Sequence, residues 1–210
     1  MAITIDIPFI EELNAKGGEG GLLLGGPGQT VQLCFIFSIL DSLKPKKILE
    51  IGTHRANFCY FAKLICPDSR ITTFGINPES EDSVYLVNKK FNNNDVTFVL
   101  GNSIETVPRY NDSFDFAWVD GAHDFETTLA DLNNCADKNI PYIMFDDVVG
   151  DPGAHDALVE FLKTRNQYKM CLMSPDPRGI VLLSNVSMEE SEKWNFFIGK
   201  FVSAIRSIQV

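Results

Sequence analysis

The chain has 210 residues, of which 45% are hydrophobic and 22% are charged, as expected for a water-soluble globular protein built around one core. Its 18 basic and 28 acidic residues give a formal net charge of −10, and basic residues do not cluster, so neither a nucleic acid nor an anionic membrane is expected as a partner. No apolar stretch could span a bilayer and the first residues do not resemble a signal peptide, so we expect a cytoplasmic protein acting on a small molecule.

The N-terminal part contains an unusual concentration of glycine. Residues 17–28 carry glycine at seven of twelve positions, a composition that does not support the interior of a helix or a strand. We therefore separate residues 1–30 as a glycine-rich N-terminal segment. It is either a connector or a mobile flap over a ligand.

Residues 31–187 then alternate between helical and strand patterns. Apolar residues at helical spacing predict five helices, at residues 31–43, 56–65, 80–91, 125–136 and 154–165. Short apolar runs between them predict five strands, at residues 47–51, 71–76, 96–100, 116–119 and 142–145. This alternation is typical of a mostly parallel sheet with helices on both faces.

The end of the chain departs from this rhythm. Two further strands are predicted at residues 168–173 and 180–183, and the Ser-Pro-Asp-Pro-Arg-Gly run between them is too short for a helical crossover, so they must form an antiparallel hairpin. Residues 188–208 carry apolar side chains at helical spacing, and we expect residues 188–210 to form an amphipathic helix. That helix packs on the same domain or forms the interface of a homodimer.

Ligands of open α/β sheets bind beyond the carboxyl ends of the strands, so the residues that follow each strand are the candidates for a site. After the first strand the sequence reads Glu50-Ile51-Gly52-Thr53-His54-Arg55-Ala56-Asn57. A glycine allows a tight turn there, and the next helix offers free N–H groups to a carboxylate. The segment resembles the glycine-rich loop of class I S-adenosylmethionine-dependent methyltransferases, although Ala56 stands where that loop has a second glycine. The dinucleotide pattern GxGxxG is absent.

The next two strand ends fit the same resemblance less closely. After the second strand comes Gly75-Ile76-Asn77-Pro78-Glu79, and the acidic residue that such enzymes use to hold the ribose is replaced by Gly75. Asn77 or Glu79 could substitute for it. After the third strand, Asn102 and Ser103 are placed by the resemblance beside the adenine. They could equally form a simple turn and helix cap.

The fourth and fifth strands end in acidic residues. Asp120 begins an Asp-Gly-Ala-His run that ends at His123, and the Asp146-Asp147 pair follows the fifth strand. Carboxylates gathered in one place raise each other's pKa unless a cation or a donor compensates, and hard oxygen ligands suit Mg²⁺ or another divalent cation. Asp120, Asp146 and Asp147 are therefore candidate metal ligands, or one of them binds an amine of the cofactor.

Residues 29–165 are similar to the metal-dependent catechol-type O-methyltransferases. That family has Asp after the fourth strand and Asp-Asn after the fifth as metal ligands, and a Lys base three residues after the first Asp, where this chain has His123. The resemblance implies a seven-stranded Rossmann-like methyltransferase fold ending in an antiparallel hairpin. It also implies that S-adenosylmethionine is bound by the residues that follow the strands, namely Glu50, Gly52, Thr53, His54, Asn57, Ile76, Asn77, Asn102, Ser103 and Asp120.

The sequence thus favours a methyltransferase that acts on a hydroxyl oxygen of a small molecule, assisted by Mg²⁺. His123 is the expected general base or a metal ligand, because imidazole accepts a proton near neutral pH; the alternative is a capping or packing residue at the start of the helix at 125–136. Asp120 is the second candidate catalytic residue. The acceptor pocket is expected from the glycine-rich segment, residues 148–155 and the last helix. Two alternatives remain: a non-catalytic binding module with a degenerate methyltransferase fold, and a metal-using enzyme of this fold, such as a hydroxylase or lyase.

Overall fold

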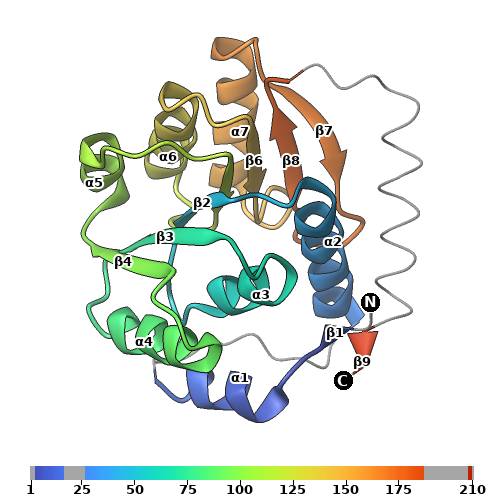
Figure 1. Cartoon of the computed structure of the whole chain (residues 1–210). Coiled ribbons are helices and arrows are strands. Elements are labelled where there is room, and N and C mark those ends of the chain that lie inside the picture. The colour runs from blue at the N-terminus through green and yellow to red at the C-terminus, as the bar shows by residue number, and fades with distance from the viewer. Residues whose placement is uncertain (1–2, 17–26, 187–207, 210) are drawn as a thin grey trace.

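The computed structural model describes residues 3–16, 27–186 and 208–209 (Figure 1). The helices in these residues are α1 (Ile7–Asn14), α2 (Pro27–Leu43), α3 (Asn57–Ile65), α4 (Ser80–Phe91), α5 (Ser103–Arg109), α6 (Phe125–Asp137) and α7 (Pro152–Thr164). The strands are β1 (Ile3–Thr4), β2 (Lys47–Ile51), β3 (Arg70–Gly75), β4 (Val96–Leu100), β5 (Phe116–Val119), β6 (Tyr142–Phe145), β7 (Lys169–Met173), β8 (Val181–Ser184) and β9 (Ile208–Gln209).

Seven of these strands form one sheet in the order β4-β3-β2-β5-β6-β8-β7. The pairs from β4 to β6 are parallel, whereas β8 is antiparallel to both β6 and β7. Within this sheet β8 therefore runs against the other six strands. The predicted architecture, a mostly parallel seven-stranded sheet with an antiparallel pair at its C-terminal end, is confirmed.

Side chains that alternate along the strands divide the core between the two faces of the sheet. On β2, Ile48 packs with the core on the side of α1 to α4, whereas Leu49 and Ile51 pack on the side of α5, α6 and α7. On β5, Phe116 and Trp118 join the first cluster. Both faces of the sheet are thus covered by helices, which leaves the strand ends as the place for a ligand (Figure 1).

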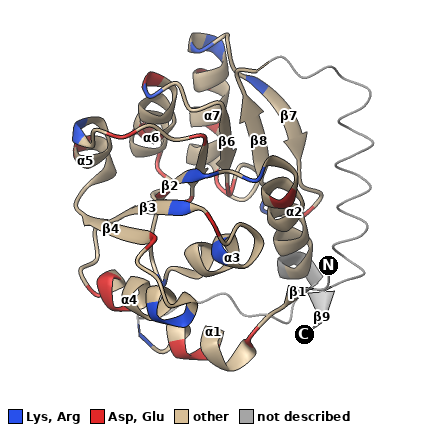
Figure 2. Cartoon of the chain, in the orientation of Figure 1, with Lys and Arg blue, Asp and Glu red and all other residues tan. Residues whose placement is uncertain are grey.

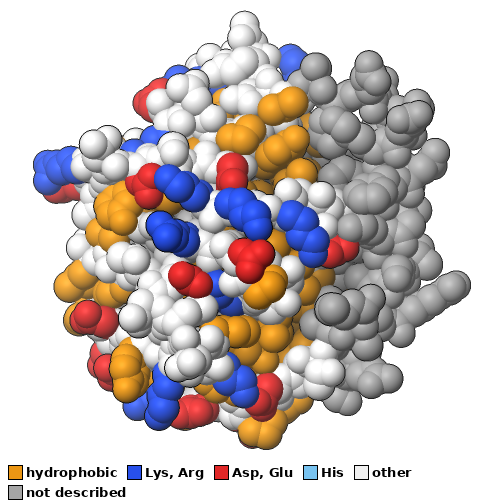
Figure 3. Space-filling view, viewed as in Figure 1, with side chains coloured by type: hydrophobic (Ala, Val, Ile, Leu, Met, Phe, Trp, Pro, Cys, Tyr) orange, Lys and Arg blue, Asp and Glu red, His pale blue; other side chains and the backbone are white. Residues whose placement is uncertain are grey.

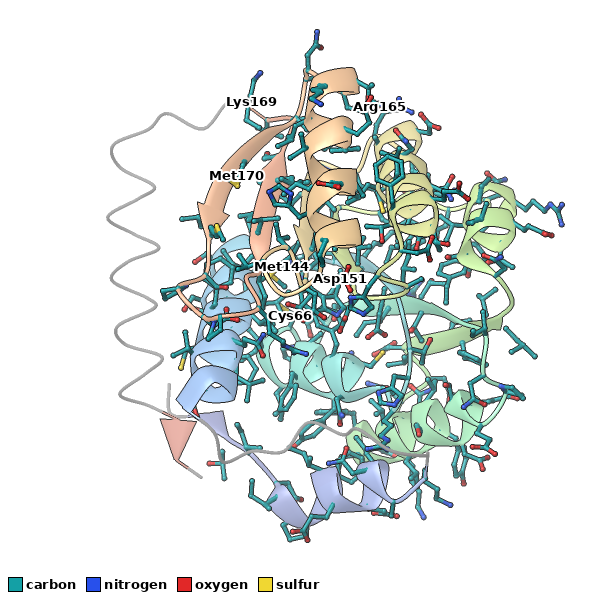
Figure 4. The ribbon with its side chains drawn as sticks, turned by 180° about the vertical axis from the view of Figure 1, so that it is seen from behind. Cys66, Met144, Asp151, Arg165, Lys169 and Met170 are labelled. Atoms are coloured by element: carbon teal, nitrogen blue, oxygen red, sulfur yellow. The ribbon has the colours of Figure 1, made fainter. Side chains whose placement is uncertain are left out.

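Polar side chains at the strand ends start the helices that follow. The carboxylate of Asp124 accepts the Thr127 N–H at 2.9 Å at the start of α6. Asp151 caps α7 in the same way, accepting the Gly153 N–H at 2.8 Å. The view from behind shows Asp151 at the lower end of α7 and Arg165 just past its upper end (Figure 4). Each cap satisfies backbone N–H groups that the first helical turn leaves free.

Four elements were not predicted. Helix α1 buries Phe9, Ile10 and Leu13 within the segment assigned to the glycine-rich N-terminus. Helix α5 contains Pro108 and buries only Val107, so its sequence has no apolar stripe. Strands β1 and β9 pair in parallel, which places Ile208 in a strand at the end of the predicted C-terminal helix.

The other predictions for the two ends of the chain concern residues that the structure does not describe. The glycine-rich residues 17–26 and residues 187–207 of the expected amphipathic helix are not among the described residues, so the flap and the homodimer interface stay predictions. Among the residues that are described, no helix is both long and apolar enough to cross a bilayer. Charged residues of both signs are spread over the helices and loops of the ribbon (Figure 2). On the face in Figure 3, basic side chains stand beside acidic ones.

Candidate active site

A cleft of about 810 Å³ lies at the carboxyl ends of the central strands, a volume within the usual range for small-molecule sites. The residues that the sequence analysis assigned to a site all line it, namely Glu50, Gly52, Thr53, His54, Asn57, Ile76, Asn77, Asn102, Ser103, Asp120, His123, Asp146 and Asp147. The parallel sheet brings these separate motifs together, because its strands end at the same edge. Their individual roles stay predictions.

The loop after β2 needs glycine at its first position. Gly52 has a φ of 103°, and a Cβ atom there would lie 1.9 Å from the backbone oxygen of Asp120. The Gly52 and Thr53 N–H groups both donate to the Phe74 carbonyl, which fixes the loop against β3. Ala56, in place of the expected second glycine, has a φ of 55° and is the N-cap of α3, so the chain adopts the left-handed turn without a glycine.

Glu50 is a buried acid in the wall of the cleft. Its side chain is 1% exposed, and its Oε2 accepts a hydrogen bond from Cys59 Sγ at 2.8 Å. Burial raises the pKa of Glu50 to about 7, against the opposing effects of Cys59 and Thr73. The carboxyl group therefore changes its charge near neutral pH and could bind an ammonium group.

The end of β3 shows why an acidic residue is missing there. A Cβ atom on Gly75 would lie 2.9 Å from Thr53 Oγ1, and Thr53 Oγ1 is hydrogen-bonded to Thr73 Oγ1 at 2.6 Å. Ile76 is 78% exposed and borders the cleft beside Asn77. Of the two residues suggested as substitutes, Asn77 lines the cleft, although its Oδ1 already accepts the Glu79 N–H at 3.0 Å. Glu79 is not part of the lining.

Asn102 and Ser103 occupy the end of β4. Asn102 Oδ1 accepts the Ile104 N–H at 3.0 Å and caps α5, as the alternative interpretation of this motif expected, and both residues also border the cleft. Behind this wall lies Asp131, which is 1% exposed. Burial raises the pKa of Asp131 to about 6, and the Ser103 hydroxyl opposes that effect.

Three of the chemistry-bearing side chains at β5 and β6 converge. Asp120, His123 and Asp147 each present a ligand atom, and these atoms lie within 4.8 Å of one another. His123 Nδ1 is 3.3 Å from Asp147 Oδ2. Two carboxylates and an imidazole are suitable ligands for a divalent cation, so the residues present fit the metal that the resemblance implies.

Asp146 does not belong to that group. Its Oδ1 accepts the Asp147 N–H at 2.8 Å, and its Oδ2 lies 3.5 Å from Arg178 Nη2. Asp147 has a φ of 59°, a left-handed conformation that turns the two neighbouring carboxylates in different directions. The geometry thus favours His123 over Asp146 as the third group beside Asp120 and Asp147.

The electrostatics of the cluster follow from burial and from charge crowding. Burial raises the pKa of Asp120 well above its usual range, and Asp146 and Asp147 raise it further. Burial also raises the pKa of Asp146 to about 7, with Asp147 as the second cause. The Arg178 guanidinium opposes the rise in both groups. A cation placed among these oxygens would favour their ionised forms.

The sequence analysis missed the side of the cleft that faces Asp147. This side is formed by Gln32, Leu33 and Ile36 of α2 and by Arg178 and Ile180 of the loop between β7 and β8. Residues 148–155, expected there, are not part of the lining. Two stacked aromatic rings of α3 and β5 also line the cleft, with the Phe58 and Trp118 centroids 5.2 Å apart. The pairing of Arg178 with an acidic cluster depends on tertiary contacts that no local pattern reveals.

Comparison with known proteins agrees with this arrangement. Residues 49–148, from β2 to the loop after β6, match the sequence model of a family described as a methyltransferase domain. Catechol O-methyltransferase B of Danio rerio is 28% identical over 148 residues, which are 66% of this chain. The match spans 55% of the length of that relative.

Two solved structures share the fold. The O-methyltransferase of Bacillus cereus in complex with SAH superposes with a TM-score of 0.68 at 18% identity, covering 86% of this chain and 91% of that one. TomG of Streptomyces achromogenes, an O-methyltransferase in complex with SAM, gives 0.66 at 15% identity, covering 87% and 91%. The strand plan and these superpositions show that the chain has the fold of the class I S-adenosylmethionine-dependent methyltransferases, and residues 49–148 are similar in sequence to a methyltransferase domain.

Proposed function

We propose that this protein transfers the methyl group of S-adenosylmethionine to a hydroxyl oxygen of a small molecule, with a divalent cation such as Mg²⁺ at the acceptor end of the cleft. The observation that carries the proposal is the cleft itself. One cavity is lined by two groups of residues, the Gly52 loop with the start of α3, and the cluster of Asp120, His123 and Asp147.

The first group of residues suits an amino-acid group that carries both charges. Free N–H groups at the start of α3 attract a carboxylate, and Gly52 lets the backbone approach closely. Glu50, two residues before Gly52, also lines the cleft, and its carboxylate is an acceptor for an ammonium group. Ile76 and Ser103 border the region to which the resemblance assigns the adenine.

The second group of residues suits deprotonation of the acceptor. Methyl transfer forms an oxygen–carbon bond as the sulfur–carbon bond breaks, and the hydroxyl proton must leave. We assign its removal to His123, whose Nδ1 faces Asp147 at 3.3 Å, so that the other ring nitrogen, Nε2, can accept the proton. Asp147 orients the ring as the carboxylate of a catalytic triad does.

Asp120 and Asp147 are the residues assigned to hold the divalent cation. A cation bound there would lower the pKa of the acceptor hydroxyl and orient its oxygen. His123 is close enough to be a third ligand, and the two roles of this side chain predict different behaviour. As a base, His123 is dispensable for cation binding, whereas as a ligand it is not.

Calorimetric titration with S-adenosylmethionine and S-adenosylhomocysteine, with and without Mg²⁺, tests the cofactor half of the proposal. We expect micromolar binding, which corresponds to about −8 kcal/mol. Gly52→Ala should abolish this binding, because a Cβ atom there would lie 1.9 Å from the backbone oxygen of Asp120 and would displace the loop. Absence of binding to the unmodified protein would favour a non-catalytic module that has kept the fold.

Methyl transfer to a panel of catechols and phenols tests the chemical half. His123→Ala should lower turnover by about 10²–10⁴-fold while cofactor and Mn²⁺ affinities stay unchanged. His155→Ala is the matched control, since His155 is exposed and outside the cleft. Chelation should abolish transfer and Mg²⁺ should restore it. Full activity in the chelated protein would remove the cation from the proposal, and lost Mn²⁺ affinity in His123→Ala would make His123 a ligand.

A further inference from the structure

Arg178 is held over the acidic cluster by its backbone. It belongs to the loop between β7 and β8, and its carbonyl accepts the N–H groups of Val149 at 2.7 Å and Gly150 at 3.1 Å. Its own N–H donates to Asp176 Oδ1 at 3.0 Å. These contacts tie the β7–β8 loop to the loop that follows β6, and they are independent of the Arg178 side chain.

The guanidinium group is divided between two carboxylates. Arg178 Nε lies 3.3 Å from Asp147 Oδ1, and Nη2 lies 3.5 Å from Asp146 Oδ2. Nη2 also donates to Gln32 Oε1 at 3.2 Å. Gln32 is itself fixed, because it is buried and its Nε2 donates to Asp176 Oδ1 at 3.1 Å. The guanidinium is therefore held over the two carboxylates by a neutral partner on α2.

This contact conflicts with occupation of the site by a divalent cation. Asp147 is the shared residue, since Oδ2 faces His123 and Oδ1 faces Arg178. A cation on Asp120 and Asp147 would bring a second positive charge next to the guanidinium, and both would draw on the same carboxylate. The Arg178 side chain is 53% exposed, so it can leave Asp147 for solvent without disturbing its backbone contacts.

We propose that the Arg178 guanidinium competes with the divalent cation for Asp147. The cation then binds only when the ion pair between Arg178 and Asp147 is broken. This inference rests on the cation site of the proposed function. Arg178 acts through Asp147 and is a positioning residue. When no cation is bound, the ion pairs of Arg178 with Asp146 and Asp147 balance the charge of these buried carboxylates. The same ion pairs lower the affinity of the site for the cation.

The test is calorimetric titration of the full chain with Mn²⁺ alone, without cofactor or acceptor. Arg178→Gln should bind Mn²⁺ about tenfold more tightly than the unmodified protein, and Mn²⁺ should raise its melting temperature by more. Arg109→Gln is the matched control, because Arg109 is an exposed arginine on α5 outside the cleft. It should leave the affinity unchanged.

A second variant and a second measurement separate direct competition from a general change of charge. Arg178→Lys keeps the positive charge but loses the planar group that spans both carboxylates, so its Mn²⁺ affinity should fall between those of the other two proteins. In the unmodified protein, Mg²⁺ should shift the Arg178 Nε–H resonance and speed its exchange with solvent.

The inference would be overturned if Arg178→Gln bound Mn²⁺ no more tightly than the unmodified protein does. It would also be overturned if the Arg178 Nε–H resonance did not change on addition of Mg²⁺. Absence of Mn²⁺ binding in every variant would overturn it as well and would remove the cation from the proposed function. S-adenosylmethionine titrations of the same samples report separately on the cofactor half, so the failures can be told apart.

Discussion

Replacement of Glu50 by glutamine should stabilise the protein at alkaline pH. Burial raises the pKa of Glu50 from 4.5 to about 7 in the folded protein, whereas the unfolded chain exposes this carboxyl group to water. Between these two pH values the folded state holds a proton that the unfolded state has released, so stability falls as pH rises. The contribution is complete below pH 4.5 and is lost as the pH passes through about 7.

The size of the effect follows from the same two values. A rise from 4.5 to about 7 corresponds to about 3 kcal/mol in the free energy of unfolding. Glutamine has nearly the same volume and carries no charge at any of these pH values. Above pH 8, Glu50→Gln should therefore be more stable than the unmodified protein by up to about 3 kcal/mol, and the difference should be small at pH 5.

Urea unfolding between pH 5 and pH 9 measures this difference, since the titration of groups that do not interact with Glu50 cancels between the two proteins; Asp120 and Cys59, whose pKa values Glu50 raises, do not cancel. Glu12→Gln on α1 is the matched control, because Glu12 is exposed and its replacement should shift stability little at any pH. A difference between Glu50→Gln and the unmodified protein that stays constant from pH 5 to pH 9 would refute the reasoning.

Three further substitutions have defined outcomes. Gly52→Ala places a methyl group 1.9 Å from the backbone oxygen of the residue that follows β5, so urea unfolding should show a loss of more than about 2 kcal/mol and calorimetry no cofactor binding. Lys63→Met deprives one carboxylate and two backbone carbonyls of a buried ammonium donor far from the cleft. It should lower the free energy of unfolding by about 3 kcal/mol with cofactor affinity unchanged. Gly75→Asp alone should cost about 1–3 kcal/mol of stability, and combination with Thr53→Ala should recover part of that loss; additive costs would contradict the contact.

The central strands could be predicted because they are buried on both faces. β2, β5 and β6 are short apolar runs bounded by polar or turn residues, and their predicted bounds agree with the structure. The bounds of the edge strand β4 were also predicted correctly, although part of it is exposed. Helix α5 could not be found in this way. It has seven residues, a proline and one buried side chain, so its existence depends on the Asn102 cap and on packing against α6.

The location of the site was predictable, whereas its internal pairing was not. A parallel sheet places the residues after β2 to β6 at one edge whatever their identity, and the cleft lies there. The sequence predicted Asp146 as the third member of the group, whereas the structure has His123 there. This difference depends on the left-handed backbone conformation of Asp147, which cannot be predicted from an aspartate in the sequence. The contact with Arg178 depends on how the β7–β8 loop folds back on the loop after β6.

Gly75 shows why a departure from a family pattern must be judged with its neighbours. Taken alone, the absence of an acidic side chain at the end of β3 indicates a degenerate cofactor site. In the structure, however, the space that a Cβ atom would enter lies against Thr53 Oγ1, at 2.9 Å, and Phe98, at 3.2 Å. Thr53 is buried and hydrogen-bonded to Thr73, so it cannot move aside without losing that bond. Gly75 and Thr53 therefore fit each other in shape. A single Gly75→Asp substitution would disturb the packing of the cleft wall and would not restore a cofactor-binding carboxylate.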